Sequence, residues 1–486
     1  MQISDSNKDY RAGGPQQVFP ERRANVHAHR RLLVGLTALA FAWRMYFVLR
    51  APFYTPDSWG YDHIAQNWLA HHVFGLEVNG RLTPIDFRLP GYPGFLAVIY
   101  ALAGVSQRTV MVTQAALDTL TCLLAGRIAR SVAPRDYANQ AEAWTLGIAA
   151  VCPFLPCYAA AVLSEVPTTL LLTAAMLVAI SAFRGENKWA WMGAGGLTGL
   201  AVLFRPESGL LAGPIGIALL LRYHARSEWP RPVRAGLLFS LGLSLTLIPW
   251  TIRNALTMHE FQPLSPRYAN SPGEYVPAGY CRWVRTWLVS MVDVDDAFWK
   301  LNEQPISIAK LPDRAFDSPA ERARVATLLD RYNRTTEITP DEDQEFAHIA
   351  SERIARHPLR YYLTAPAHRA MTMWFTPRVE TLAYSGDVWP PLELIEDDWR
   401  DFLVSSSLGG MNIILIGLAG LGLFAWQKRL AYVDLLLVWI LLRTAYLTTV
   451  ETPEPRYVIE CYPALFVFAA LGVIALGRRF HIASKP

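Results

Sequence analysis

The chain has 486 residues, of which 52% are hydrophobic and only 18% are charged. Its formal net charge of +4 is too small to indicate a nucleic-acid partner, and Arg and Lys gather mostly at the ends of apolar runs. The five cysteines include no C-x-x-C pair and no zinc-type spacing, so neither a disulfide framework nor a structural metal is expected. Together these values exclude an ordinary soluble domain and predict an all-α, polytopic membrane protein.

Apolar runs that approach the roughly 20 residues needed to cross a bilayer recur along the chain. They predict ten spans, at 32–50, 108–130, 142–158, 166–183, 188–204, 206–222, 234–252, 405–426, 430–449 and 456–477. The apolar stretch 91–104 is too short for a span, and we interpret it as an interfacial helix. Basic residues cluster at every second loop, so the positive-inside rule predicts that both termini are cytoplasmic.

These spans divide the chain into five parts. They are a cytoplasmic tail at 1–31, a membrane module at 32–252 with a long first outer loop at 51–107, an outer segment at 253–404, C-terminal membrane helices at 405–477 and a cytoplasmic tail at 478–486. Because the first 30 residues are polar and the first apolar run has full span length, we expect that run to remain as an anchor. Helical patterns at 319–335 and 341–356 predict a small folded domain in the outer segment.

An acidic and aromatic cluster, Pro56-Asp57-Ser58-Trp59-Gly60-Tyr61-Asp62, directly follows the first apolar run. A carboxylate at this place beside the membrane could accept a proton from a hydroxyl that attacks a sugar carbon, the role of a general base. Asp57 is the first candidate, and Asp62 could share the role although it faces a different direction. The alternative is structural, because Asp57 and Ser58 could simply cap a juxtamembrane helix that begins there.

Glu165 lies in the next outer turn, between two Ala-rich apolar runs. An unpaired ionised carboxylate is costly in such surroundings, so its presence indicates either a function or an ion pair. The alternative is that Ser164 caps a helix and Glu165 lies in its first turn. There the negative charge of Glu165 would interact favourably with the helix dipole.

Three arginines, Arg88, Arg205 and Arg456, lie in Pro-flanked turns on the same predicted face. Guanidinium groups bind phosphate oxygens through several hydrogen bonds, which makes these residues candidate phosphate ligands. Ion pairs with Glu165, Glu207, Glu451 or Glu454, or contacts with lipid headgroups, would explain them equally. The histidines of the first outer loop, His63, His71 and His72, match no metal-binding motif.

With these residues in place, the chain resembles the GT-C class of lipid-linked-sugar-dependent glycosyltransferases. The resemblance is to the dolichyl-phosphate-mannose protein mannosyltransferase superfamily and to bacterial relatives such as lipid A aminoarabinose and lipopolysaccharide galacturonic acid transferases. The residues that carry it are Arg44, Asp57-Ser58 with Tyr61, Arg88-Leu89-Pro90-Gly91-Tyr92-Pro93, Leu163-Ser164-Glu165, Gly199 to Pro206, Pro249 to Asn254, and Arg456-Tyr457 with Pro463.

This resemblance implies a GT-C-type helical bundle of about ten transmembrane helices in the inner membrane. It implies transfer of a hexose or pentose, with inversion, from a polyprenyl-phosphate donor to a hydroxyl of a lipid, glycan or protein acceptor on the periplasmic face. Asp57 takes the role of the catalytic carboxylate, assisted by Glu165. The residues expected to bind substrate are Arg88, Tyr61, Tyr92, Arg205, Arg456 and Tyr457. The resemblance implies no required cofactor and leaves a divalent metal open.

The pattern departs from the family at one point, because many members have two adjacent acids where this chain has Asp57-Ser58. Two other classes of protein remain as alternatives. A transporter or flippase of lipid-linked glycans would carry ionisable residues near the middle of the membrane, whereas here the charges gather at one face. A non-catalytic membrane assembly protein would not need Asp57 and Glu165 together.

Overall fold

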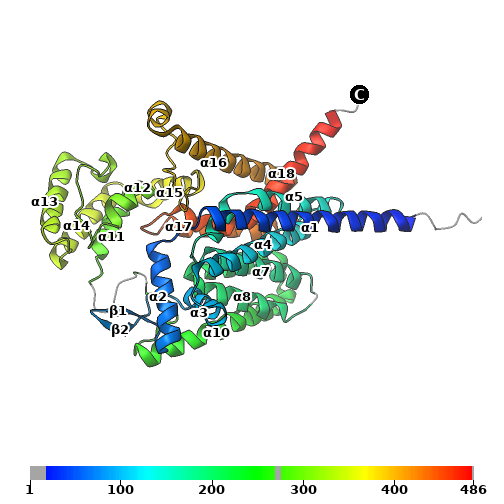
Figure 1. Ribbon diagram of the computed structural model, residues 1–486, viewed down its shortest axis with the longest axis horizontal. Coiled ribbons are helices and arrows are strands. Elements are labelled where there is room, and N and C mark those ends of the chain that lie inside the picture. The colour runs from blue at the N-terminus through cyan, green and yellow to red at the C-terminus, as the bar shows by residue number, and fades with distance from the viewer. Residues whose placement is uncertain (1–17, 186, 267, 269–274, 484–486) are drawn as a thin grey trace, which may run out of the picture.

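The computed structural model describes residues 18–185, 187–266, 268 and 275–483, and these are mostly helical (Figure 1). Within them, six helical stretches are long and apolar enough to cross a membrane. They are His27–Arg50 of α1 (Val18–Arg50), α4 (Gln107–Val132), α7 (Glu165–Phe183), α10 (Pro230–Thr257), α16 (Pro391–Trp426), and Pro455–Arg478 of η7 (Pro455–Cys461) and α18 (Tyr462–Ala483). The predicted multi-span helical architecture is therefore present.

The other four predicted spans are also helical, but with 11 to 15 residues each they are shorter than a full crossing. They correspond to α5 (Ala138–Val151), α8 (Ala190–Phe204), α9 (Ala212–Arg222) and α17 (Val433–Leu447). The expected span at 142–158 is wrong as one helix, because the chain leaves helical geometry at Cys152 before Pro153 and continues as α6 (Phe154–Ala159). The total of ten spans stays a prediction.

Residues 51–107, the predicted first outer loop, contain two helices and a hairpin. The juxtamembrane helix expected after Asp57 is α2 (Pro56–His71), and the stretch 91–104 forms α3 (Gly91–Ala103). Between them β1 (Gly75–Val78) pairs antiparallel with β2 (Arg81–Pro84), with Gly75 opposite Pro84. The sequence analysis missed this hairpin.

The helix α18 lies at the centre of the membrane bundle. The most apolar stretch of Pro455–Arg478 is 94% buried inside the protein. Small residues permit its close contact with α16: a Cβ atom on Gly422 would lie 2.0 Å from the Phe468 carbonyl oxygen. Such close backbone approach is typical of packed membrane helices. The two short 3₁₀ turns η1 (Arg135–Tyr137) and η3 (Arg226–Glu228) connect helices at the end of the bundle that carries its basic loops.

Part of the segment 253–404 forms a small helical unit with its own core (Figure 1), and its position outside the membrane stays a prediction. Its elements are α11 (Ala278–Val284), α12 (Met291–Asp293), η4 (Val294–Phe298), η5 (Asp313–Ala315), α13 (Pro319–Thr335), α14 (Pro340–Arg356), η6 (Arg360–Thr364) and α15 (Ala365–Trp374). The helices expected at 319–335 and 341–356 are α13 and α14. Trp283, Trp287 and Phe346 are buried in the core that these elements share.

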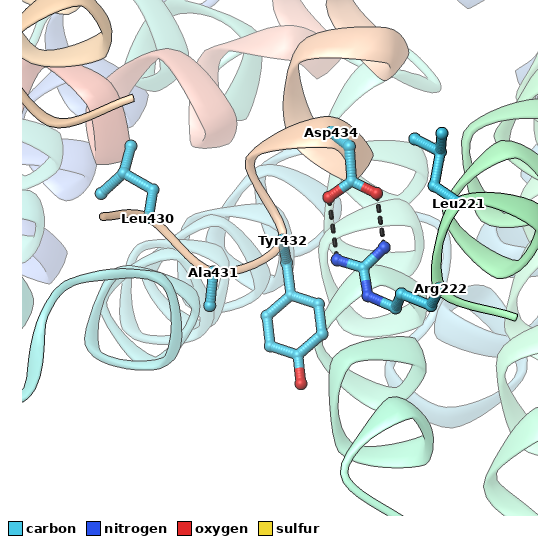
Figure 2. A pocket seen from close by; sticks show the side chains of 6 residues that line it. All are labelled: Leu221, Arg222, Leu430, Ala431, Tyr432 and Asp434. Carbon is cyan, nitrogen blue, oxygen red and sulfur yellow. Dashed lines mark hydrogen bonds and ion pairs between the residues drawn. The ribbon is translucent and has the colours of Figure 1, made fainter. Parts of the chain in front are cut away.

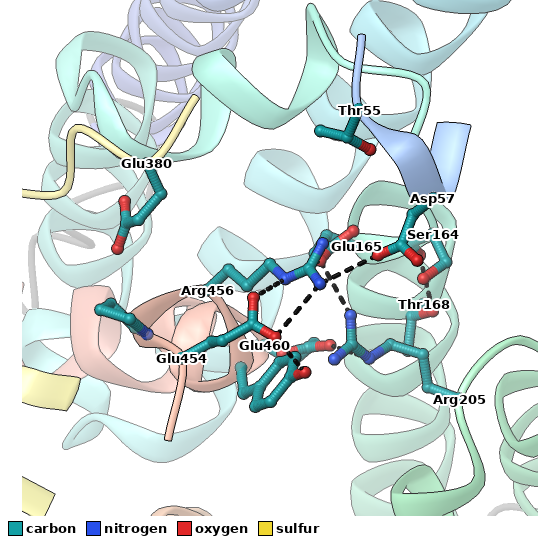
Figure 3. Close-up of polar contacts among 12 residues, drawn as sticks. Thr55, Asp57, Ser164, Glu165, Thr168, Arg205, Glu380, Glu454, Arg456 and Glu460 are labelled. Atoms are coloured by element: carbon teal, nitrogen blue, oxygen red, sulfur yellow. Dashed lines mark hydrogen bonds and ion pairs between the residues drawn. The ribbon is translucent and has the colours of Figure 1, made fainter. Parts of the chain in front are cut away.

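Two further elements bring distant parts of the chain to one end of the bundle. The 3₁₀ turn η2 (Pro206–Leu211) joins α8 to α9, and η7 leads into α18. Together with the first turns of α2 and α7 they lie near one another, on the side of the bundle that faces the outer segment (Figures 1 and 3).

Candidate active site

The start of α2 positions Asp57. Thr55, not Asp57, is the N-cap: its hydroxyl accepts a hydrogen bond from the Ser58 amide at 3.1 Å, and the Ser58 hydroxyl accepts one from the Thr55 amide at 3.0 Å. This reciprocal capping satisfies the helix end. The expectation that Asp57 and Ser58 could cap the helix is therefore right for Ser58 and wrong for Asp57, whose carboxylate is left free for other partners.

Those partners are two arginines from distant segments. Arg88 Nη2 lies 2.8 Å from Asp57 Oδ1. Arg456 Nη2 lies 3.0 Å from Asp57 Oδ2, and Figure 3 shows this second contact. Burial raises the pKa of the Asp57 carboxyl, but the charges of Arg88 and Arg456 outweigh it, and the resulting pKa is below the ordinary value. The Asp57 side chain, 26% exposed, is therefore an ionised carboxylate held at an accessible edge of the bundle.

Glu165 opens α7 and is almost completely buried. The Ser164 side chain makes no capping bond, so the capping alternative is wrong for Ser164. Glu165 Oε1 instead pairs with Arg205 Nη1 at 2.9 Å. Its second oxygen, Oε2, has no hydrogen-bond partner, and the residue lines a cavity of about 10 Å³ together with Asp118.

Arg205 and Arg456 connect Glu165 to further acids, and two of these, Glu207 and Glu454, are ion-pair partners that the sequence offered. Arg205 Nε lies 2.9 Å from Glu207 Oε1 and 3.2 Å from Glu460 Oε1. Arg456 Nε lies 2.6 Å from Glu454 Oε2. We call the resulting set the Asp57 cluster; its members are Asp57, Arg88, Glu165, Arg205, Glu207, Arg443, Glu454, Arg456 and Glu460.

Arg443 and Glu460 could have been found from sequence. Each is a charged residue inside an apolar run, which is costly unless the charge is paired. Arg443 Nη2 lies 2.9 Å from Glu460 Oε2, and both side chains are fully buried. They are the fully buried members of the cluster. Asp57 and Arg88 are its most exposed members and form its rim, with 26% and 32% of their side chains exposed.

The predicted tyrosines take two different positions. Tyr61 lies under Arg88, whose guanidinium carbon is 5.3 Å from the ring centre, and Tyr457 lies under Arg205 at 5.0 Å. Tyr92 packs edge-on against Tyr61 and is 1% exposed, with its hydroxyl donating to Gln114 Oε1 at 2.8 Å. Tyr61 and Tyr457 thus support arginines of the cluster, and Tyr92 supports Tyr61 from behind.

Among the described residues, no group of three or more His, Cys, Asp or Glu side chains is arranged to hold a metal ion. A larger cavity, about 470 Å³, is lined by Leu221, Arg222, Leu430, Ala431, Tyr432 and Asp434 (Figure 2). Arg222 and Asp434 neutralise each other there through two contacts, one of them 2.8 Å long, and none of the predicted site residues lines it. The candidate site is therefore the Asp57 cluster.

Fold and site together define a class: a multi-pass helical membrane protein with a carboxylate held between arginines at one end of its bundle. Residues 88–251 match the model of the family described as dolichyl-phosphate-mannose-protein mannosyltransferase. This match places that segment in the GT-C glycosyltransferase superfamily, so the resemblance seen in the sequence is confirmed. The segment includes Arg88, Glu165 and Arg205, whereas Asp57 and Arg456 lie outside it. No curated protein matches the chain in sequence.

Several solved structures are similar over most of the chain. The archaeal oligosaccharyltransferase AglB from Archaeoglobus fulgidus, in complex with an inhibitory peptide and a dolichol-phosphate, is 13% identical with a TM-score of 0.49, over 95% of this chain and 52% of that one. ArnT from Cupriavidus metallidurans, bound to undecaprenyl phosphate, is 14% identical with a TM-score of 0.38, over 92% and 77%. Arabinosyltransferase EmbB from Mycobacterium smegmatis is 14% identical with a TM-score of 0.29, over 97% and 43%.

The present chain spans about half the length of the archaeal enzyme.

Proposed function

We propose that the protein transfers a sugar from a polyprenyl-phosphate carrier to a hydroxyl group of an acceptor, on the periplasmic face of the inner membrane and with inversion at the anomeric carbon. The observation that carries this proposal is the position of Asp57, a solvent-accessible carboxylate between two arginines at the rim of an otherwise buried charged cluster. Residues 88–251, which match the family model described as dolichyl-phosphate-mannose-protein mannosyltransferase, supply Arg88 to this arrangement.

In the proposed reaction, the acceptor hydroxyl attacks the anomeric carbon of the donor sugar and gives its proton to Asp57. A new bond forms between the acceptor oxygen and that carbon, while the bond from the carbon to the phosphate oxygen breaks. The leaving phosphate takes the electron pair, and arginines of the cluster stabilise its growing negative charge. Such stabilisation is strongest where little water reaches the charges, and Arg205 and Arg456 are only 11% and 18% exposed.

The lowered pKa of Asp57 makes it a poor base while Arg88 and Arg456 bind it directly. A donor phosphate that binds these arginines adds negative charge beside Asp57 and offsets their effect. The basicity of Asp57 would therefore rise when the donor is bound, because the pKa of a carboxyl rises near a like charge. Glu165 assists by fixing Arg205, to which it is bound at 2.9 Å.

The test is transfer of label from a panel of radiolabelled polyprenyl-phosphate sugars in membranes that contain the wild-type protein, Asp57→Asn or Asp62→Asn at matched levels. Asp62 is the control, because it lies on the same helix but accepts hydrogen bonds from Tyr100 at 2.6 Å and Tyr54 at 3.3 Å. We expect one donor to be used by the wild type and by Asp62→Asn, and at least about 100-fold slower transfer by Asp57→Asn. Full activity of Asp57→Asn would refute the base assignment.

A wild type that transfers no sugar from any donor would refute the proposed function. Transport of the same lipids across the membrane would then be the next activity to measure.

A further inference from the structure

Helix α15 follows the helical unit in sequence, but its C-terminal end packs into the membrane bundle. The fully buried residue Met373 belongs to the hydrophobic core of the bundle, which is separate from the core that contains Trp283. The Trp374 indole donates a hydrogen bond to Thr444 Oγ1, in the last turn of α17, at 3.0 Å. Figure 1 shows α15 between the helical unit and the bundle. The end of α15 is therefore part of the bundle.

This end also lies beside the apolar run of α16. Asn412 of α16 donates hydrogen bonds to the carbonyl oxygens of Trp374, at 2.6 Å, and Thr376, at 3.1 Å. Asp401 is the last charged residue before that apolar run. At 1.5 Å per residue, Asn412 stands about 16 Å further along the helix. The hydrocarbon layer of a bilayer is about 30 Å thick, so α15 ends at the depth of that layer.

The C-terminal carbonyl groups of α15 are bound by buried side chains. A helix that ends in water leaves its last carbonyl groups to solvent. Here Asn412 is fully buried, and Arg378, which is 2% exposed, donates to the carbonyl oxygen of Met373 at 2.7 Å. The chain then returns through residues 377–379, which are buried as well. Backbone that leaves helical geometry at membrane depth must be enclosed by protein in this way.

The other side of the same helical stretch is apolar and exposed. Leu363, Ala367 and Met371 recur at four-residue intervals and so share one side of the helix. Leu363 is 63% exposed and Met371 57% exposed, and Phe375 continues the face beyond the end of α15. The one ionisable residue among the exposed residues of α15 is His368, in its first half. An exposed apolar face of this kind indicates contact with another apolar phase.

Exposed tryptophans indicate where that phase begins. Trp189 and Trp229 are exposed beside the basic loops at one end of the bundle, and Trp389 and Trp399 are exposed around the first turns of α16 at the other end. Tryptophan is enriched at both interfaces between membrane and water. The start of α16 is therefore the interface that α15 would cross.

We propose that α15 is a re-entrant helix, which enters the membrane from the side of the helical unit and turns back after Trp374. Its exposed face then contacts the acyl chains of the lipids in that leaflet. The ten residues of α15 cover about 15 Å, half the thickness of a hydrocarbon layer. The predicted outer segment 253–404 thus includes a part that lies in the membrane. This proposal does not depend on the proposed transfer activity.

The test attaches a nitroxide spin label to single cysteines of the purified protein in vesicles of phosphatidylethanolamine and phosphatidylglycerol. Met371→Cys reports on the proposed lipid face. The controls are Ile414→Cys, on the exposed side of the α16 span, and Gln344→Cys, on the exposed surface of α14. The wild type gives the background, since its five cysteines are buried. The collision rate of each label is measured with oxygen, which dissolves in hydrocarbon, and with chromium oxalate, an anion that does not.

We expect the Met371 label to collide with chromium oxalate at least about tenfold less often than the Gln344 label, because hydrocarbon excludes charge. Its collision rate with oxygen should match that of the Ile414 label. The unfolding midpoint should stay at the wild-type value, because Met371 is exposed. If Met371→Cys does not fold, Leu363→Cys on the same face gives the same comparison.

Two results would overturn the proposal. A Met371 label that meets chromium oxalate as often as the Gln344 label does would show that α15 lies in water. A Met371 label that is shielded from both reagents would show that protein, either this chain or a second copy of it, covers the face instead of lipid.

Discussion

Replacement of Arg205 by leucine is predicted to destabilise the protein by about 3–5 kcal/mol, the cost of leaving buried charge without its partner. Arg205 is 11% exposed and binds Glu165, Glu207 and Glu460 at 2.9, 2.9 and 3.2 Å. Without it, Glu207 and Glu460 retain Arg443 at 3.5 and 2.9 Å. Glu165 retains only Arg456 Nε, 3.9 Å away, so most of the cost should come from Glu165.

The assay is unfolding of the purified protein in mixed micelles with increasing denaturing detergent, followed by the fluorescence of the 16 tryptophans. If Glu165 carries the cost, Arg205→Leu combined with Glu165→Gln should be more stable than Arg205→Leu alone. The double mutant should recover about 1–3 kcal/mol, the coupling expected of residues in one network. The control is Arg231→Leu, which removes an exposed pair with Glu228 and should cost less than about 1 kcal/mol.

Two results would refute this reasoning. One is additivity: if the changes in the free energy of unfolding caused by Arg205→Leu and Glu165→Gln simply add, the Glu165 carboxylate is not stabilised by Arg205. If Arg205→Leu costs no more than Arg231→Leu, the buried cluster is solvated in the membrane protein and its ion pairs contribute little.

Two further predictions follow from Asp57 and from Gly91. Because the pKa of Asp57 is lowered in the folded protein, its contribution to stability is complete above the ordinary carboxyl pKa of about 3.9 and is lost as the pH falls through the folded value. The stability difference between wild type and Asp57→Asn, measured by thermal unfolding, should thus shrink below about pH 4; growth of that difference on acidification would contradict the pairing. Gly91→Ala should cost about 1–3 kcal/mol, because the added Cβ would lie 2.5 Å from the Leu203 carbonyl oxygen, between α3 and α8. Gly60→Ala, where a Cβ would meet no atom within 4 Å, is the control, and equal unfolding midpoints for the two variants would show that α3 moves freely.

Secondary structure that depends on local pattern could be predicted closely. The 3.6-residue periodicity of 319–335 gave α13 with both its ends, because Ser318 caps the helix and Pro319 occupies its first turn. The hairpin β1–β2 was missed, since strands of four residues carry too few positions for an alternating pattern to stand out. The break at Cys152 was also missed, because apolar composition continues through Pro153 although helical geometry does not.

The sequence by itself determined that the chain is a multi-span helical protein. It also singled out Asp57 and Glu165 as candidate catalytic acids and three arginines as candidate phosphate ligands. It could do so because apolar length and buried charge are properties of short segments. Only the tertiary structure decided the partners. Asp57 and Arg456 are 399 residues apart, and the residue type of an acid does not reveal which guanidinium will reach it.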